Sequence, residues 1–437
     1  MTNETAAPWN PQPGPAEPPS SRSEINLSWF APFGMIGLSL VNFFYRLITL
    51  GIYDFWARTE VRKRLWSAIR LNGEPLVYTG TGKELFLGFL IVFGVVLLPI
   101  MLISFGAVFA FGPRSTFFQI FNVALYAFAF FLFGVGIFRA QRYRLLRTTW
   151  RGIRGSLSGD SWKYGLTYFL TILLVPLTLG WIVPWRTTKL QSMITNNAYF
   201  GDQPFSFKGG SGPLYGPFAL LWFGVLFLSI GTFMIIGIIM QMVQRALGPG
   251  ALEPGFKMPS EIAAYLSFVT LSILAVGYLL YLFISAWYRS RTINHFAQCT
   301  HFDDARFEGR VTGGGLLWID ITNLLIQILG VVLMLIPVLI IIALIAAAGL
   351  GPQEANLQSS QIGLANGFLA VFAPISVLIL ALSFTLLLPV TQARSMGYLI
   401  RNLSLNGSVD VDKISQSTAQ QMSTGEGLAQ AFDIDAF

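Results

Sequence analysis

Charged residues are scarce in this chain. Of its 437 residues, 11% are charged and 54% are hydrophobic, whereas a soluble globular domain carries about 25% charged residues. A chain this long with so few charges cannot cover a globular surface with polar side chains. Lipid removes that need, because apolar side chains are its preferred neighbours. The composition therefore excludes an ordinary soluble protein and predicts a protein that crosses a membrane several times.

Cysteine and histidine are nearly absent. Cys299 is the sole cysteine, so no internal disulfide can form, and it lies between the only two histidines, His295 and His301. Imidazole and thiolate groups four residues apart on a helix could ligate a soft or borderline metal. These positions nevertheless align with ordinary variable positions of the first repeated segment described below. We therefore treat the three residues as a weak metal site and expect no metal and no other cofactor.

Catalytic motifs are missing as well. The sequence holds no nucleophile elbow, no HExxH motif and no paired carboxylates, and its glycine runs lack the Gly-Lys-Ser/Thr of a phosphate-binding loop. The net charge of +7 does not indicate nucleic acid, because basic residues of membrane proteins collect beside anionic headgroups. We expect neither an enzyme nor a nucleic-acid partner.

Long apolar stretches are plentiful. One helical crossing needs about 20 apolar residues. Six stretches meet this length, at about 85–111, 117–138, 214–242, 263–286, 316–348 and 368–388. Two more, 28–55 and 162–185, are apolar but interrupted by proline, glycine or polar residues. The predicted fold is an all-α polytopic membrane protein with six to eight transmembrane helices.

Polar segments flank this predicted membrane region. Residues 1–27 are polar and rich in proline, which predicts a disordered tail. Residues 28–388 form the predicted transmembrane domain. Residues 389–437 are polar with little apolar periodicity, and we expect a loosely ordered cytoplasmic tail there.

The polar connections repeat one another. In three of them a tryptophan is followed closely by an arginine and then, 20 to 22 residues after the tryptophan, by an aromatic-x-Gly triplet. The residues of this unit are Trp56, Arg58, Tyr78 and Gly80; Trp185, Arg186, Phe207 and Gly209; and Trp287, Arg289, Phe307 and Gly309. Segments 139–161 and 389–410 are more divergent copies. Because tryptophan prefers the membrane interface and basic amphipathic helices lie along headgroups, the pattern predicts internal repeats with basic interfacial helices between the spans.

The basic residues also predict sidedness. The five repeated segments carry 23 of the 28 Lys and Arg residues, and the three other connections carry 3. If all five segments are cytoplasmic, the positive-inside rule is obeyed, and 28–55 and 162–185 must enter and leave on one side. The alternative is a pair of inverted three-helix repeats, as in many transporters, with a much weaker charge bias. We favour the first arrangement.

Polar residues inside apolar stretches are the remaining candidates for a site. Asp320, Asn323 and Gln327 share one helical face, and Asn42 and Arg46 lie four residues apart in the first interrupted stretch. Ionisable groups inside membranes often mark pathways, so these residues could form an intramembrane polar site with an Arg46–Asp320 pair. The alternative is that 316–327 is an amphipathic lead-in at the interface.

Three runs carry a resemblance to a known family. TLGIYDFWARTEVRKRLW, RTTWRGIRG and GEGLAQAFDIDAF resemble the YjgN family of bacterial inner-membrane proteins, over about residues 28–437. The resemblance implies a location in the bacterial inner membrane. It implies no reaction, substrate or catalytic residue, because the family is a domain of unknown function.

Two function classes remain. The first is transport of a small solute or ion, which a polar cavity near 42–46 and 320–327 would favour. The second is a non-catalytic structural protein whose basic cytoplasmic belt binds anionic phospholipids of the bilayer, which a dry helical bundle would favour.

Overall fold

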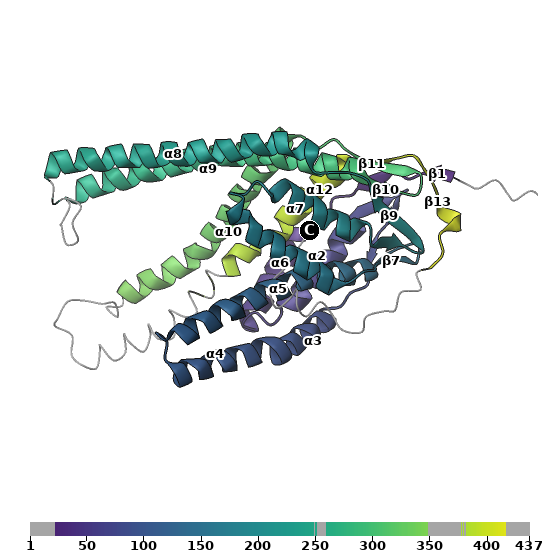
Figure 1. Cartoon of the computed structure of the whole chain (residues 1–437), viewed down its shortest axis with the longest axis horizontal. Coiled ribbons are helices and arrows are strands. Elements are labelled where there is room, and N and C mark those ends of the chain that lie inside the picture. The colour runs from purple at the N-terminus through teal and green to yellow at the C-terminus, as the bar shows by residue number, and fades with distance from the viewer. Residues whose placement is uncertain are drawn as a thin grey trace, which may run out of the picture.

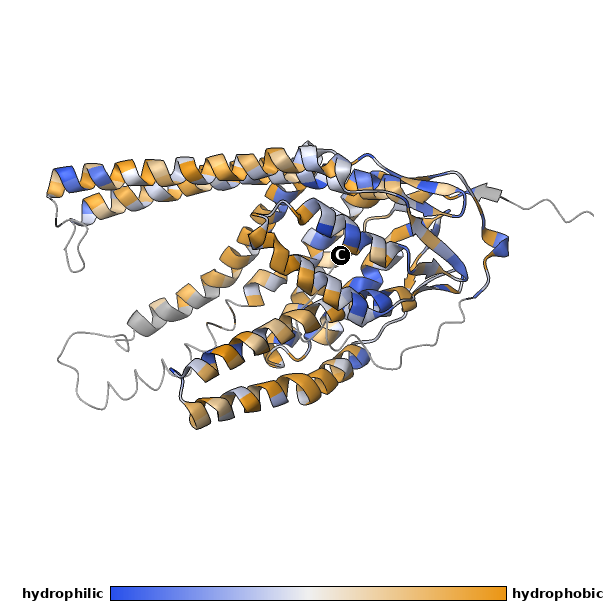
Figure 2. Cartoon of the chain, viewed as in Figure 1, coloured by the Kyte–Doolittle hydropathy of each residue, from blue (hydrophilic) through white to orange (hydrophobic). Residues whose placement is uncertain are grey.

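A computed structural model describes residues 22–248, 250, 259–347, 377, 379 and 382–416 of the chain. Long helices extend from one end of a body of shorter helices, and short strands gather at the opposite end (Figure 1). The long helices are predominantly apolar, whereas hydrophilic residues are frequent around the strands and short helices (Figure 2). The molecule therefore has a lipid-compatible end and a more polar end.

Five helical stretches within these residues are long and apolar enough to cross a membrane. They are Gly82–Phe111, which comprises α3 (Gly82–Val92), the π-helical turn η1 (Phe93–Leu97) and α4 (Leu98–Phe111); α5 (Thr116–Leu146); α8 (Gly212–Leu247); α9 (Ser260–Cys299); and Gly313–Ile336, the first part of α10 (Gly313–Ala347). They confirm the first five predicted spans. The predicted span at 368–388 lies mostly outside the described residues.

The two interrupted stretches contain shorter helices. α1 (Met35–Ile48) has 14 residues and α6 (Ser161–Leu177) has 17. At 1.5 Å per residue these helices are about 21 and 26 Å long, shorter than a hydrocarbon core of about 30 Å. Each is followed by a turn and then by a second helix, α2 (Asp54–Ala68) or α7 (Val183–Thr195).

The two turns have the same sequence and the same backbone. Residues 49–51 and 178–180 are both Thr-Leu-Gly, and in each the leucine and glycine are left-handed, with φ of 51° and 90° or 50° and 88°. Each threonine hydroxyl accepts a hydrogen bond from the backbone N–H four residues later, at Tyr53 or Ile182. Glycine tolerates the second left-handed position without a Cβ clash.

The strands are short and antiparallel. Their bounds are β1 (Arg22–Glu24), β2 (Leu27–Trp29), β3 (Ile69–Leu71), β4 (Glu74–Pro75), β5 (Val77–Tyr78), β6 (Thr148–Trp150), β7 (Ile153–Leu157), β8 (Ala198–Phe200), β9 (Gln203–Phe207), β10 (Thr300–Phe302), β11 (Ala305–Gly309), β12 (Leu403–Asn406) and β13 (Ser408–Asp410). An eight-stranded sheet runs in unbroken chain order from β5 to β12, and β2, β3 and β4 form a second sheet. β4 leads into β5 through Leu76, and β12 lies beside β2. The strands from β2 to β12 therefore follow one another around a ring, which we call the strand ring.

The helices that connect one strand to its hydrogen-bonded neighbour begin and end at this strand ring. We call each such helical connection an excursion. The helices α1 and α2 connect β2 to its hydrogen-bonded neighbour β3, and α6 and α7 connect β7 to its neighbour β8. The longer helices do the same: α3 to α5 join β5 to β6, and α8 and α9 join β9 to β10. α10 follows β11, and α12 (Leu388–Arg401) returns to β12, its partner. Paired neighbouring strands place both ends of each excursion at the same end of the molecule.

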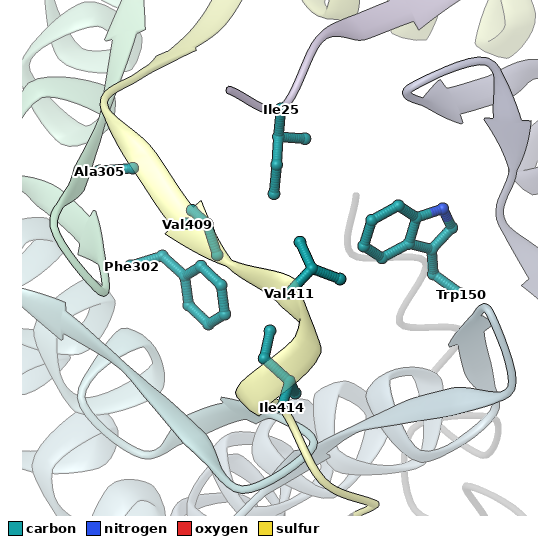
Figure 3. Packing of buried hydrophobic residues seen from close by; sticks show 7 residues of the cluster. All are labelled: Ile25, Trp150, Phe302, Ala305, Val409, Val411 and Ile414. Carbon is teal, nitrogen blue, oxygen red and sulfur yellow. The ribbon is translucent and has the colours of Figure 1, made fainter. Parts of the chain in front are cut away.

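A hydrophobic cluster closes one side of the strand ring. The buried side chains are Ile25, Trp150, Phe302, Ala305, Val409, Val411 and Ile414 (Figure 3). The C-terminal segment, β13 and the 3-10 helix η3 (Val411–Lys413), crosses the ring and sets Val411 between Phe302 and Trp150 (Figure 3). β1 pairs with β13, from Arg22 opposite Asp410 to Glu24 opposite Ser408. Segments 22–24 and 408–410, far apart in the sequence, thus meet at the strand ring.

These contacts correct two expected boundaries. Residues 22–27 of the predicted disordered tail and 389–416 of the predicted loose tail are folded, because their strands pair and bury Ile25 and Val409. The helical membrane fold is confirmed in outline. The sequence indicated only short extended stretches after the interfacial helices, since strands of two to five residues are too short to display a clear alternation of apolar residues.

Candidate functional site

The predicted polar face of α10 is occupied by contacts to its neighbours. Asp320 Oδ2 lies 2.7 Å from Arg289 Nη1 on α9. Asn323 donates from Nδ2 to Ser395 Oγ on α12, at 2.9 Å, and accepts at Oδ1 from Arg394 Nε, at 3.2 Å. These side chains therefore lie between helices as internal hydrogen-bonding groups.

Gln327 extends the same row. Its Nε2 donates to Thr391 Oγ1 of α12 at 3.2 Å, while its Oε1 is buried without a hydrogen-bond partner among the described residues. Arg394 also donates to Thr322 Oγ1, at 2.6 Å. The α12 partners were not identified from the sequence, because the only signal was that Arg394 lies in the divergent fifth segment.

Asn42 and Arg46 form a separate buried group on α1. Their exposed fractions are 1% and 6%. Arg46 Nη2 lies 2.6 Å from Asp54 Oδ1, and the other oxygen of Asp54 lies 2.5 Å from Arg58 Nε. Both polar atoms of Asn42 are buried without a hydrogen-bond partner among the residues that the structure covers. Because Arg46 pairs with Asp54 and Asp320 with Arg289, the hypothesised Arg46–Asp320 pair is wrong.

The three tryptophans of the predicted interfacial unit have different roles. Trp56 stacks on Tyr53, with ring centroids 6.3 Å apart. A Cβ added to Gly82 would lie 2.7 Å from the Cα of Trp56. A Cβ added to Gly313 would likewise lie 3.0 Å from the Cα of Trp287. Trp185 is 43% exposed. Two of the tryptophans therefore hold the start of the following span closely, and the third is open to the surroundings.

The arginines of the unit are engaged with carboxylates or rings. Arg58 pairs with Asp54 and Arg289 with Asp320. Arg186 stacks its guanidinium 4.5 Å from the centre of the Tyr168 ring, and its Nε and Nη2 are buried without hydrogen-bond partners among the described residues. These arginines position helices as well as carrying charge.

The aromatic-x-Gly triplets are packing devices. Tyr78 and Phe207 are buried, and Phe307 faces the inside of the strand ring. A Cβ on Gly80 would lie 2.7 Å from the Tyr78 ring. On Gly209 it would collide with the Cys299 Sγ, and on Gly309 it would lie 2.7 Å from the Asn294 Oδ1. These glycines therefore allow close contact with their neighbours.

The weak metal-site residues do not converge. His295 Nε2 lies 2.8 Å from the Gly210 carbonyl and 3.7 Å from Cys299 Sγ. His301 Nδ1 lies 3.1 Å from the backbone carbonyl of Cys299. No group of three or more His, Cys, Asp or Glu side chains in the described ranges could hold a metal ion.

An open groove, for which no sequence pattern provides a signal, lies where α1 begins. Its volume is about 520 Å³, and its lining is formed by Phe33, Gly34, Gly37, Leu38, Val41 and Arg64. Arg64, on α2, donates from Nη1 to the carbonyls of Phe33 and Gly34, at 3.3 and 3.1 Å. We call this feature the Arg64 groove. It combines an apolar wall with one guanidinium group, which is the chemistry of a site for an amphipathic anion.

Exposed ion pairs lie on the strand ring. Arg151 hydrogen-bonds Glu74 at 2.8 Å and lowers the pKa of that carboxyl below its ordinary value. Arg310 and then Asn406 lower the pKa of the Glu308 carboxyl in the same way. Such exposed pairs contribute little free energy.

Comparisons with known proteins agree with this picture. Residues 33–431 match the family described as "Bacterial protein of unknown function (DUF898)". A protein of Salmonella typhimurium (strain LT2) named "Inner membrane protein YjgN" is 24% identical over 323 residues, which cover 64% of this chain and 76% of the relative. No solved structure matches the chain significantly.

Proposed function

The chain belongs to this family of bacterial proteins of unknown function and is a multi-pass protein of the inner membrane; on that premise we propose that it is a non-catalytic lipid-binding protein, which holds an anionic phospholipid in the Arg64 groove. The groove is the observation that carries the proposal. Its guanidinium group suits a phosphate, and its apolar wall suits the beginning of an acyl chain.

The surroundings of the Arg64 groove support a lipid as its occupant. The face of α1 beside it is apolar and exposed: Ile36 is 62% exposed, Leu40 40% and Phe44 57%. A soluble protein rarely leaves such a contiguous face uncovered. Lipid chains along this face would continue into the groove, with the headgroup at Arg64.

Exposed basic residues elsewhere on the molecule can also attract anionic headgroups. Lys163 on α6, Lys189 on α7 and Arg291 on α9 are all exposed. Trp162 is 49% exposed beside Lys163, as expected of a ring at the membrane interface. We propose that these residues form a belt that attracts anionic headgroups, each cation contributing about 1 kcal/mol near the surface.

Transport of a small solute or ion is the weaker proposal. The polar residues that would line a pathway are divided between two places. Asp320, Asn323 and Gln327 are bonded to α9 and α12, while Asn42 and Arg46 lie on α1. A pathway would need these internal hydrogen bonds to break, at a cost of about 0.5–1.5 kcal/mol each.

We further propose that the chain consists of one unit used five times, with six crossings. Support comes from the shared Thr-Leu-Gly turns and from strand pairing that returns each excursion to the strand ring. In this arrangement α1 and α6 are re-entrant, which suits their length. The basic segments then all lie on the cytoplasmic side.

Phospholipid counting tests the lipid proposal. The full chain is placed in nanodiscs containing equal parts phosphatidylglycerol and phosphatidylcholine, released, and weighed by native mass spectrometry. We expect retained phosphatidylglycerol on the wild type and about tenfold weaker retention on Arg64→Ala, because one charge-assisted contact is worth about 1.5–3 kcal/mol. Arg64→Lys should retain part of the binding.

Lys63→Ala is the matched control. Lys63 precedes Arg64 on the same helix, is exposed and pairs with Glu60, outside the groove. Its removal lowers the net charge equally and should leave specific retention intact. Equal loss in the two variants, or no preference for phosphatidylglycerol in the wild type, rejects a site at Arg64.

Cysteine labelling tests the sidedness. Arg114 precedes α5 and Ser158 follows it after β6 and β7, so the two positions lie at opposite ends of that helix. With Cys299 replaced by serine, a membrane-impermeant maleimide applied to whole cells should label Arg114→Cys and spare Ser158→Cys. The reverse pattern rejects the cytoplasmic assignment.

A further inference from the structure

An apolar cavity lies inside the strand ring. Its volume is about 170 Å³, and its wall is drawn from nearly every strand of the ring. The lining includes Leu27, Leu71, Trp150, Phe205, Phe307 and Leu405, from β2, β3, β6, β9, β11 and β12. Because successive strands each contribute a side chain to it, the cavity is a feature of the whole ring.

The polar members of the wall offer little to a polar ligand. The hydroxyl of Thr148 already donates to the Arg144 carbonyl, at 2.7 Å, and accepts from Trp66 Nε1, at 2.7 Å. The indole nitrogen of Trp150 points away from the other labelled side chains (Figure 3). Water needs two to four polar partners to remain in a cavity, so this one is expected to be dry.

The size of the cavity limits what fits. An engineered apolar cavity of about 150 Å³ binds benzene and stays dry without it. Native interiors rarely leave a void of this size, because the lining atoms lose dispersion contacts. A hydrocarbon group that filled the space would restore those contacts and shed its own apolar surface from water.

We propose that the strand ring binds a hydrocarbon group of about the size of one aromatic ring, as a free small molecule or as the end of a lipid chain. The two sources share the same chemistry, which is an uncharged group without hydrogen-bonding atoms. This site is separate from the Arg64 groove, which selects an anion at the start of α1. Either proposal can fail without the other.

The C-terminal segment is the natural cover of this site. Val411 and Ile414 pack in the cluster beside the cavity, and Ile414 also lines it. Asp202 holds the segment from the β8–β9 turn: its Oδ1 accepts from the Ser415 backbone N–H, at 3.1 Å, and its own N–H donates to the Ser415 carbonyl, at 3.2 Å. Gln416 adds two hydrogen bonds, accepting at Oε1 from the Arg154 N–H at 3.1 Å and donating from Nε2 to the Gly152 carbonyl at 2.8 Å. Opening of this segment would uncover the side of the cavity that Ile414 lines.

Fluorine NMR of the full-length protein in nanodiscs tests the proposal, with fluorobenzene as the probe. We expect a saturable bound resonance, distinct from the lipid-dissolved signal. Leu405→Phe and Leu27→Phe add a ring to the wall and should each lower the affinity at least about tenfold. The matched control, Leu87→Phe, adds the same ring at a 44% exposed position of α3 and should leave the resonance unchanged.

A substitution that enlarges the cavity, in place of filling it, distinguishes loss of the site from loss of folding. Leu405→Ala enlarges the cavity, so the bound resonance should persist and also appear with larger fluorinated aromatics. Absence of a saturable signal in the wild type, or equal binding in the filled variants and the control, overturns the proposal.

A second arm identifies the source of the group. A phospholipid with a photoreactive group at the end of its acyl chain is built into the nanodisc and activated. Labelling of peptides containing Phe302 or Phe307 indicates that a lipid chain reaches the strand ring. Fluorobenzene binding without such labelling assigns the site to a free small molecule.

Discussion

Arg289 and Asp320 form an ion pair, with 2.7 Å between Nη1 and Oδ2. The pair joins the C-terminal part of α9 to the first turns of α10. Arg289 was identified from sequence as part of an interfacial unit and Asp320 as part of an intramembrane site. The pair makes both residues members of one helix contact. A double-mutant cycle with Arg289→Ala and Asp320→Ala should give a coupling energy of about 0.5–1 kcal/mol in reversible detergent unfolding, since both side chains are partly exposed.

Arg46 provides the control for this cycle. Arg46 pairs with Asp54 on the neighbouring helix α2, at 2.6 Å. Arg46→Ala and Asp320→Ala should therefore be additive within about 0.5 kcal/mol. Strong coupling between Arg46 and Asp320 would contradict the helix arrangement.

The contacts between tryptophans and the first glycine of a span predict a steric effect. Gly82→Ala and Gly313→Ala place a Cβ 2.7 and 3.0 Å from the Cα atoms of Trp56 and Trp287. Each should lower the free energy of unfolding by about 1–3 kcal/mol through overpacking. Thermal unfolding in detergent measures the effect.

Gly106→Ala is the control for this substitution. Gly106 lies within α4 and has no atom within 4 Å of its added Cβ. Alanine there should raise helix stability by up to about 1 kcal/mol, so its unfolding temperature should move the other way. Equal losses at Gly82 and Gly106 would show that the tryptophan contact is not the cause.

The Thr-Leu-Gly turns predict matched losses at two distant positions. Gly51 and Gly180 have φ of 90° and 88°, a region that a side chain disfavours. Gly51→Ala and Gly180→Ala should each cost about 1–2 kcal/mol, because the backbone and not the neighbours sets the penalty. Gly231→Ala, in an open position of α8, should cost nothing. Thermal unfolding of the three variants checks this, and unequal losses would separate the two turns.

Acid should loosen the C-terminal segment from the strand ring. The hydrogen bonds to Ser415 lower the pKa of Asp202 below its ordinary value of 3.8. A carboxylate with a lowered folded-state pKa stabilises the contact above the ordinary pKa, and the stabilisation is lost as the pH falls through the lowered one. Hydrogen exchange of residues 411–416, corrected for intrinsic rates, should be slow at pH 5 and faster below about pH 3.8.

Asp202→Ala separates this carboxylate from the other acidic groups. The variant should show fast exchange of residues 411–416 already at pH 7. Glu74→Gln removes a different carboxylate with a lowered pKa, from the β4–β6 side of the ring, and should leave their protection unchanged. Unaltered protection in Asp202→Ala would mean that other contacts hold the segment.

Predictions from the sequence were reliable where the signal was long and repeated. The five apolar stretches of 20 or more residues that lie in the described ranges are helices, because a lipid environment requires internally bonded backbone and leaves few alternatives. The identical Thr-Leu-Gly triplets at 49–51 and 178–180 adopt the same backbone, since a left-handed glycine turn is a local property of the chain.

Predictions about partners were less reliable. The pattern placed Asp320, Asn323 and Gln327 on one helical face, which is correct, and could not say that Arg289, Thr391, Ser395 and Arg394 would meet them. Helical periodicity fixes the direction of a side chain on its own helix. It does not fix the neighbour that this side chain faces.

The sequence by itself determined a membrane protein with basic, tryptophan-containing segments between its spans, because composition and periodicity act over the whole length of a helix. Only the tertiary structure decided that those segments end in short paired strands, that the strands form a strand ring with an apolar cavity, and that residues 22–25 and 408–414 fold against it. The reason is physical: strands of two to five residues are marginal as isolated hairpins, and most of them also pair with a strand 40 or more residues away in the sequence. Such distant pairing leaves no local trace.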